Sequence, residues 1–177
     1  MNLPKNSRGF TIIELLVTMS IITIIAGGII PTFSSYIKNQ NLKQAQEQLK
    51  SDLRTVQNRA LTGALSNEDI PNGSGNLVKY WGVLFPSESG ASMSVFVSTN
   101  ETCNIAMSNV EKQNDFNLPN DVMYFVDNSG CIFFNMKNGD ITDTIGTDAI
   151  RLKFKSSDPD ALPVNFNSAG LIWTENN

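Results

Sequence analysis

The chain has 177 residues, with 13 lysine and arginine residues against 17 aspartate and glutamate residues, and no histidine. This length suffices for one membrane segment and one domain of ordinary size. Without histidine, the chain has no Ser-His-Asp triad, no Cys-His catalytic pair and no imidazole metal site. We therefore expect no catalytic residue, no cofactor and no enzyme activity.

The N-terminal stretch predicts a membrane-spanning helix. A polar leader, residues 1–9, precedes an apolar run of 21 residues from Phe10 to Ile30, and Pro31 closes the run. As a helix the run would be roughly 31 Å long, close to the ~30 Å hydrocarbon thickness of a bilayer. It exceeds the apolar core of a secretory signal peptide, and no small-residue cleavage site follows it.

The charges in and around the run carry further information. The leader contains Lys5 and Arg8, so the positive-inside rule places the N-terminus in the cytoplasm and residues 32–177 outside. The run itself holds one charged residue, Glu14. A carboxylate inside an apolar layer is costly, and such residues are usually functional and paired. No cation lies nearby along the run, so we expect its partner at the lipid interface or on another chain.

Gly9-Phe10-Thr11, followed by Glu14 and an apolar helix, resembles the prepilin signature of type IV pilins and type II secretion pseudopilins. The resemblance implies that a prepilin peptidase cuts between Gly9 and Phe10 and methylates the new N-terminus of Phe10. It also implies that Glu14 pairs with the N-terminal amine of a neighbouring subunit during assembly. The alternative is that Glu14 lies at the level of the lipid headgroups.

Pro31 lies where many members of this family carry a proline. A proline within a helix removes one hydrogen bond and clashes with the carbonyl four residues earlier, here that of Gly27. Gly28 lowers the helix propensity further, so residues 27–31 are the weakest part of the predicted helix. This part is either a kink at the membrane exit or, as the resemblance implies, a point of local unwinding during assembly.

Residues 32–63 predict an amphipathic stem helix. Apolar residues recur at spacings of three and four, at Leu42, Ala45, Leu49, Leu53, Val56 and Ala60. Gly63 is expected to end the helix. Residues 32–62 carry five cations against two acids, whereas residues 63–177 carry six cations against 14 acids. This asymmetry suggests electrostatic complementarity between stem and head, within or between subunits, or simply two solvated surfaces.

Residues 64–177 predict a β-rich head. The expected strands are 77–85, 92–98, 122–126, 131–136, 150–155 and 164–166 with 171–173. The Ser-Gly and Asn-Gly turns within 127–130 and at 138–139 are hairpin signals, and residues 168–170 are a further break between strands. We expect an exposed loop at 66–76 and a loop with a short helix at 105–120. The fold class is therefore α+β, a long N-terminal helix packed on a C-terminal antiparallel sheet.

The head is similar to H-type minor pseudopilins and related minor pilins. The similarity rests on the order of Trp81-Gly82-Val83-Leu84-Phe85, Leu118-Pro119-Asn120-Asp121-Val122, Ile150-Arg151-Leu152 and Val164-Asn165-Phe166. It implies a pilin-like head and a minor subunit. Another pilin-type β head is the alternative.

The two cysteines, Cys103 and Cys131, permit a disulfide if the head lies outside the cytoplasm, and two free thiols are the alternative. Asp140, Asp143 and Asp148 offer oxygen ligands, but their spacing lacks the pattern of a calcium-binding loop. We therefore expect no metal.

These features predict a pilin-like subunit of a type IV pilus or a type II secretion pseudopilus. We expect a single-pass inner-membrane protein with its head outside the cytoplasm, later part of a periplasmic pseudopilus or a cell-surface pilus. The expected partners are prepilin peptidase, other pilin or pseudopilin subunits and the inner-membrane assembly platform. The alternative is a filament-displayed binding module for DNA uptake, adhesion or secreted-protein recognition. The head has few cations, so we do not expect nucleic acid as a partner.

Overall fold

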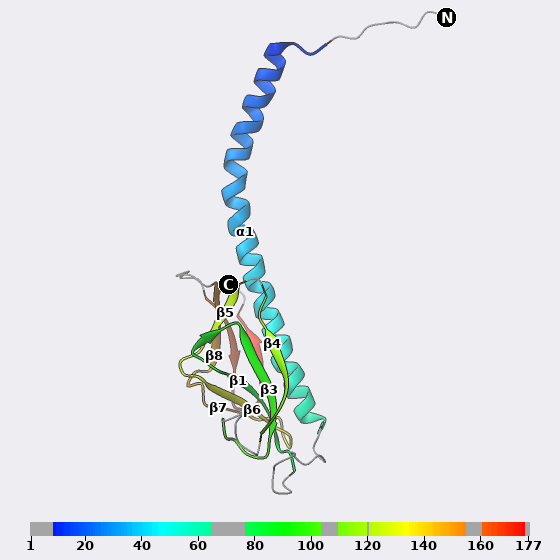
Figure 1. The fold of residues 1–177 in the computed structure, drawn as a ribbon, viewed down its shortest axis with the longest axis vertical. Coiled ribbons are helices and arrows are strands. Elements are labelled where there is room, and N and C mark those ends of the chain that lie inside the picture. Colours follow the sequence, from blue (N-terminus) through cyan, green and yellow to red (C-terminus); the bar gives the residue numbers. More distant parts are fainter. Residues whose placement is uncertain (1–8, 65–76, 104–109, 120, 155–160, 176–177) are drawn as a thin grey trace, which may run out of the picture. The chain divides into compact units, whose positions relative to one another are not determined.

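The computed structural model describes residues 9–64, 77–103, 110–119, 121–154 and 161–175 (Figure 1). The chain divides into two compact units, Met1–Gln40 and Asn41–Asn177. One helix, α1 (Ile12–Leu61), contributes to both, whereas all the described strands belong to the second unit. The boundary between the units therefore falls inside the helix, and residues 41–61 of the expected stem fold with the strands.

The C-terminal end of α1 is fixed by a glycine in the left-handed region. Gly63 has φ of +66°, a conformation that residues with a side chain rarely adopt. Its N–H donates to the carbonyl of Ala60 (N···O 3.0 Å), and the N–H of Ala64 donates to that of Arg59 (3.1 Å). This pair of bonds is a Schellman motif, which satisfies carbonyls that the helix end would leave unpaired. The prediction that Gly63 ends the helix is confirmed.

The second half of α1 packs against the strands through the predicted apolar positions (Figure 1). All six are buried, namely Leu42, Ala45, Leu49, Leu53, Val56 and Ala60. They share one hydrophobic core with side chains from the strands, and each buried leucine contributes roughly 1.5–3 kcal/mol through removal of its surface from water. The helical spacing of these residues is therefore the reason why this part of α1 belongs to the second unit.

Two five-stranded sheets complete the described part of this unit. The first has the order β4 (Val110–Asn117), β3 (Ser92–Ser98), β1 (Tyr80–Phe85), β6 (Gly130–Asn135) and β7 (Ile141–Asp143). The second has the order β10 (Ile172–Thr174), β9 (Leu162–Phe166), β8 (Ala149–Phe154), β5 (Val122–Phe125) and β2 (Ser89–Gly90). Every strand pair is antiparallel. The long N-terminal helix and the antiparallel sheets confirm the predicted α+β class.

Most of the predicted strands are confirmed, and two expectations are wrong. The predicted strand 92–98 matches β3 at both ends. The expected loop with a short helix at 105–120 is wrong over Val110–Asn117, because β4 occupies these residues and pairs with β3, whereas residues 105–109 lie outside the described residues. The turn at 127–130 is not a hairpin, since it links β5 in one sheet to β6 in the other. The expected loop at 66–76 lies outside the described residues.

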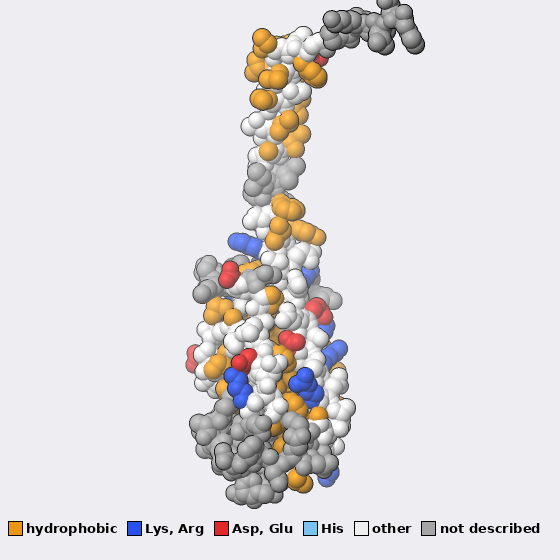
Figure 2. Space-filling view, turned by 45° about the vertical axis from the view of Figure 1, so that its right-hand side comes forward, with side chains coloured by type: hydrophobic (Ala, Val, Ile, Leu, Met, Phe, Trp, Pro, Cys, Tyr) orange, Lys and Arg blue, Asp and Glu red, His pale blue; other side chains and the backbone are white. Residues whose placement is uncertain are grey.

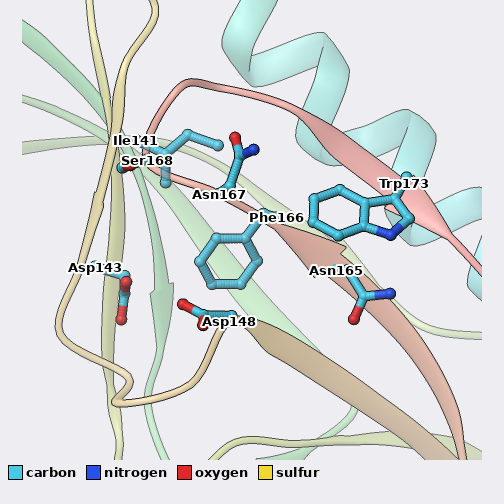
Figure 3. Close-up of a pocket in the computed structure, with 8 residues that line it drawn as sticks. All are labelled: Ile141, Asp143, Asp148, Asn165, Phe166, Asn167, Ser168 and Trp173. Carbon is cyan, nitrogen blue, oxygen red and sulfur yellow. The ribbon is translucent and has the colours of Figure 1, made fainter.

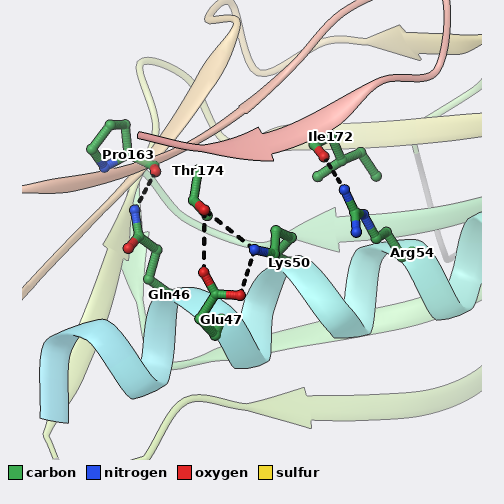
Figure 4. Close-up of polar contacts among 7 residues, drawn as sticks. All are labelled: Gln46, Glu47, Lys50, Arg54, Pro163, Ile172 and Thr174. Carbon is green, nitrogen blue, oxygen red and sulfur yellow. Dashed lines mark hydrogen bonds and ion pairs between the residues drawn. The ribbon is translucent and has the colours of Figure 1, made fainter. Parts of the chain in front are cut away.

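Polar side chains of α1 fix strands β9 and β10 against the helix (Figure 4). The bonds run from Gln46 Nε2 to the Pro163 carbonyl (2.7 Å), from Lys50 Nζ to Thr174 Oγ1 (3.2 Å) and from Arg54 Nη2 to the Ile172 carbonyl (2.7 Å). The ion pairs of the described residues are Glu47–Lys50, Lys112–Asp115 and Arg151–Asp127, and none of them joins α1 to a strand. Lys50 and Arg54 of the stem therefore reach neutral acceptors on the strands, and none of the described ion pairs joins a stem cation to an acid of the head.

Candidate processing and assembly site

The predicted cleavage bond, between Gly9 and Phe10, lies in an exposed, irregular segment before α1. Neither residue is in a helix or strand, and Phe10 is 82 % exposed. A Cβ atom added to Gly9 would meet no other atom within 4 Å. The packing of the chain itself therefore does not require glycine here, so a requirement for it would come from an enzyme that holds this bond.

The side chains of Thr11 and Glu14 form a capping box at the start of α1. The N–H of Thr11 donates to Glu14 Oε2 (3.0 Å), and the N–H of Glu14 donates to Thr11 Oγ1 (3.3 Å). The Thr11 hydroxyl donates to the same carboxylate oxygen (2.9 Å). This reciprocal arrangement satisfies two backbone donors that a helix start would leave unpaired. The sequence had pointed to Thr11 only as part of the prepilin signature and not as a helix cap, although Thr-x-x-Glu before an apolar run is the signal for such a cap.

The cap gives Glu14 a partner within its own chain. The sequence predicts a partner only at the lipid interface or on another chain. Only Oε2 takes part in the cap, and Oε1 accepts no hydrogen bond from any described residue. A carboxylate has about four acceptor positions, so Oε1 is able to accept an amine while Oε2 stays in the cap. Cleavage after Gly9 would leave both residues of the capping box in the mature chain.

Gly9, Phe10, Thr11 and Glu14 line one depression of about 270 Å³. The structure thus brings the predicted cleavage bond and the predicted assembly carboxylate together. Pro31 lies 17 residues further along, roughly 25 Å at the rise of a helix, and the backbone of α1 is helical through it. The leader cations Lys5 and Arg8, on which the predicted orientation rests, lie outside the described residues.

The first unit exposes a large apolar surface (Figure 2). The large hydrophobic side chains from Phe10 to Ile25 are 51–83 % exposed. Within the described residues α1 is the one helix long and apolar enough to cross a membrane, with a mean hydropathy of 2.2 over 18 residues. An apolar surface of this extent marks contact with lipid or with other protein chains.

Three hydroxyl groups of this segment form hydrogen bonds within the helix, as an apolar environment requires. The donors are Thr18, Ser20 and Thr23, whose hydroxyls bond to the carbonyls of Leu15 (3.0 Å), Leu16 (2.8 Å) and Met19 (2.8 Å). Because each bond is made within the helix, no hydroxyl among these three needs water as an acceptor. The segment is therefore suited to lipid despite its polar residues.

The predicted cysteine pair lies in the second unit, away from these residues in the chain. Cys103 and Cys131 are joined by a disulfide, with their Cα atoms 5.5 Å apart. Cys131 is buried on β6, where it packs with Phe96 and Phe133. The bond thus links Cys103, which follows β3 in the chain, to β6 of the first sheet.

One comparison with known families gives a match. The family described as the prokaryotic N-terminal methylation motif matches residues 4–30. The matched residues include the bond between Gly9 and Phe10, the capping box and the apolar segment of α1. No curated protein and no solved structure matches the chain. Such a motif implies cleavage by prepilin peptidase and assembly with other pilins. The match shows that this chain carries the N-terminal methylation signature of type IV pilins and pseudopilins.

Proposed function

We propose that this chain is a minor, H-like subunit of a type IV pilus or a type II secretion pseudopilus. The peptidase cuts after Gly9 and methylates Phe10. The mature chain stays in the inner membrane through residues 10–31 until the assembly platform draws it into a filament. Its role is structural, without catalysis, and its head lies outside the cytoplasm.

The observation that carries this proposal is the match of residues 4–30 to the methylation motif on a helix whose apolar side chains are exposed. Such a helix needs lipid before assembly and other subunits afterwards. The order of motifs in the head, from Trp81 to Phe166, supports the H-like assignment. The few cations of the head argue against nucleic acid as its ligand.

In the filament, Glu14 has two tasks in this proposal. Oε2 holds the capping box, and Oε1 receives the methylated amine of the Phe10 of an adjacent subunit. The pairing of two charges in an apolar environment favours assembly and sets the axial position of each subunit. The charge is therefore needed for assembly and not for insertion into the membrane.

Four variants separate cap, charge and processing. Glu14→Gln keeps the cap acceptor but loses the charge, because glutamine also serves in capping boxes. Glu14→Leu loses both, and Thr11→Ala weakens the cap but keeps the charge. Gly9→Leu is the control for processing, since it should remain uncleaved. The measurement is the share of each variant found in membranes, in cleaved form and in isolated filaments.

We expect the three helix variants to insert and to be cleaved. Glu14→Gln and Glu14→Leu should both be depleted from filaments at least tenfold, whereas Thr11→Ala should assemble. Normal assembly of Glu14→Gln would contradict the charge pairing. Assembly of all three variants would place Glu14 at the headgroup level instead. The minor role is tested by the ratio of this chain to the most abundant subunit in the same filaments, which should be far below one.

A further inference from the structure

The exposed hydrophobic side chains of α1 continue past the predicted membrane segment, residues 10–31 (Figure 2). Phe33, Tyr36 and Ile37 have exposed fractions of 60, 59 and 41 %. Residues three and four positions apart are neighbours on a helix surface, so these three side chains lie on one side of α1. We call Phe33, Tyr36 and Ile37 the aromatic patch.

The polarity of the helix changes where the aromatic patch ends. The next four residues, 38–41, are Lys-Asn-Gln-Asn. Leu42, the next apolar residue, is buried in the core of the second unit. The run of exposed apolar side chains that begins at Phe10 therefore ends at Ile37, and not at Pro31.

Tyr36 has the two-sided character of residues at a membrane surface. Its side chain is exposed beside Phe33 and Ile37, and its hydroxyl accepts a hydrogen bond from Gln40 Nε2 (3.0 Å), one turn further along the helix. The ring thus belongs to the apolar surface, whereas the hydroxyl meets the polar residues that follow. Tyrosine is enriched at membrane–water interfaces because it combines an apolar body with a polar tip.

Lys38 supplies a charge that complements phosphate headgroups. It is exposed, and none of the described ion pairs includes it. The sequence has no acid between Glu14 and Glu47, so this stretch of the helix does not repel an anionic surface. A lysine beside an apolar surface is able to extend its stem along that surface and to place its amine among the headgroups. Because the patch is also continuous with the apolar side chains from Phe10 to Ile25, lipid fits it better than a second chain does.

The length of the helix agrees with this occupant. From Phe10 to Tyr36 the chain rises by roughly 39 Å as a helix. A bilayer is about 30 Å thick in its hydrocarbon core and about 40–45 Å thick with its headgroup layers. A tilt of about 20°, the average for membrane helices, shortens the projected length by only a few ångströms. Phe10 and Tyr36 are therefore able to reach the two opposite headgroup layers at the same time.

We propose that the aromatic patch binds the lipid interface at which α1 leaves the membrane. The ring of Phe33 lies at the edge of the hydrocarbon, the hydroxyl of Tyr36 among the headgroups, and the amine of Lys38 at their phosphates. Pro31 then lies inside the hydrocarbon, where backbone groups must be paired within the helix, in agreement with the helical backbone through this residue. The inference rests on the proposed membrane span of residues 10–31 and extends that span to Tyr36.

The test uses the full chain with one added tryptophan, reconstituted at a low protein-to-lipid ratio that keeps subunits apart. The vesicles contain phosphatidylglycerol and a phosphatidylcholine with bromine either near the headgroup or deep in the acyl chain. Bromine quenches tryptophan fluorescence on contact, so the two lipids report the depth of the added residue. The unmodified chain, with Trp81 and Trp173 in the second unit, gives the background.

We expect Tyr36→Trp to lose more emission to shallow than to deep bromine, because tryptophan also suits an interface. The matched controls are Ile21→Trp, which should be quenched most by deep bromine, and Gln44→Trp, an exposed position eight residues after Tyr36, which should be quenched by neither. All three positions are exposed on α1, so the substitutions leave the core of the second unit intact.

The pattern of quenching separates two kinds of failure. If Ile21→Trp is quenched by deep bromine but Tyr36→Trp behaves like Gln44→Trp, the membrane ends before the aromatic patch. That result overturns the inference and leaves the patch as a surface for other subunits. If Ile21→Trp is not quenched at all, the membrane span itself is absent, and the proposed function fails together with the inference.

Discussion

Reduction of the Cys103–Cys131 disulfide should destabilise the second unit by an amount that follows from its position. The bond joins residues 28 apart in the sequence. In the chain-entropy model, closing a loop of this length in the unfolded state stabilises the folded state by about 3.5 kcal/mol. The second unit, Asn41–Asn177, has about 140 residues, so its unfolding entropy is about 0.29 kcal/mol per kelvin. The melting temperature should therefore fall by about 12 °C.

The assay is thermal unfolding of the full chain in detergent, followed by near-ultraviolet circular dichroism, with and without reductant. A Cys103→Ala/Cys131→Ala variant is the control, because reductant should not change its melting temperature. Labelling of the oxidised, denatured chain should modify neither cysteine. A decrease of less than about 4 °C on complete reduction would refute the reasoning, as would labelling of both thiols without reductant.

Three further predictions concern the second unit. Leu49→Ala removes a fully buried anchor of α1 and should lower the free energy of unfolding by about 2–5 kcal/mol in denaturant titrations, unlike the exposed Leu61→Ala. Gly82→Ala would place a Cβ atom 2.3 Å from Cζ of Phe96, so it should cost about 1–3 kcal/mol, and an added Phe96→Leu change should recover part of this loss. Burial raises the pKa of Asp52, so the folded chain favours the protonated carboxyl group. The stability gained from this shift is fully present below the unfolded pKa of about 3.9, and it is lost as the pH rises through the folded pKa. Asp52→Asn should therefore raise the melting temperature at pH 7 and leave it unchanged at pH 3; an equal effect at both pH values would contradict this.

The sequence predicted those elements whose local pattern agrees with their tertiary environment. The stem is one such element, because its apolar spacing and Gly63 specify a helix, its buried face and its end. The strand 92–98 is another, since it is rich in β-branched and aromatic residues. The prepilin signature was found because its residues are adjacent in the chain.

The elements that the sequence did not predict depend on contacts between distant segments. β4 has the sequence Val-Glu-Lys-Gln-Asn-Asp-Phe-Asn, which is mostly polar, and it becomes a strand because β3 offers a free edge. A cross-strand bond from Ser94 to Asp115 Oδ1 (2.6 Å) supports this pairing. The neighbours of Asn165, which are Trp173 on β10 (Figure 3) and Ala149 on β8, likewise follow from the register of three strands, which no local pattern specifies.

The capping box changes the physical account of Glu14. Part of the cost of a carboxylate in an apolar layer is offset inside the chain, because Thr11 supplies a hydroxyl and an N–H to it. A monomer in the membrane therefore keeps a stable helix start before any neighbour arrives. What a neighbouring subunit adds is a counter-charge, and the comparison of Glu14→Gln with Thr11→Ala isolates that contribution.

The central claim is that the chain is processed as a prepilin, and the intact mass of the mature protein tests it most directly. The protein is isolated from membranes and from sheared filaments and is measured whole by mass spectrometry, with fragmentation from the N-terminus. We predict a mature chain whose first residue is N-methylated Phe10. A mature chain that starts at Met1, or that starts after residue 31, would contradict the account.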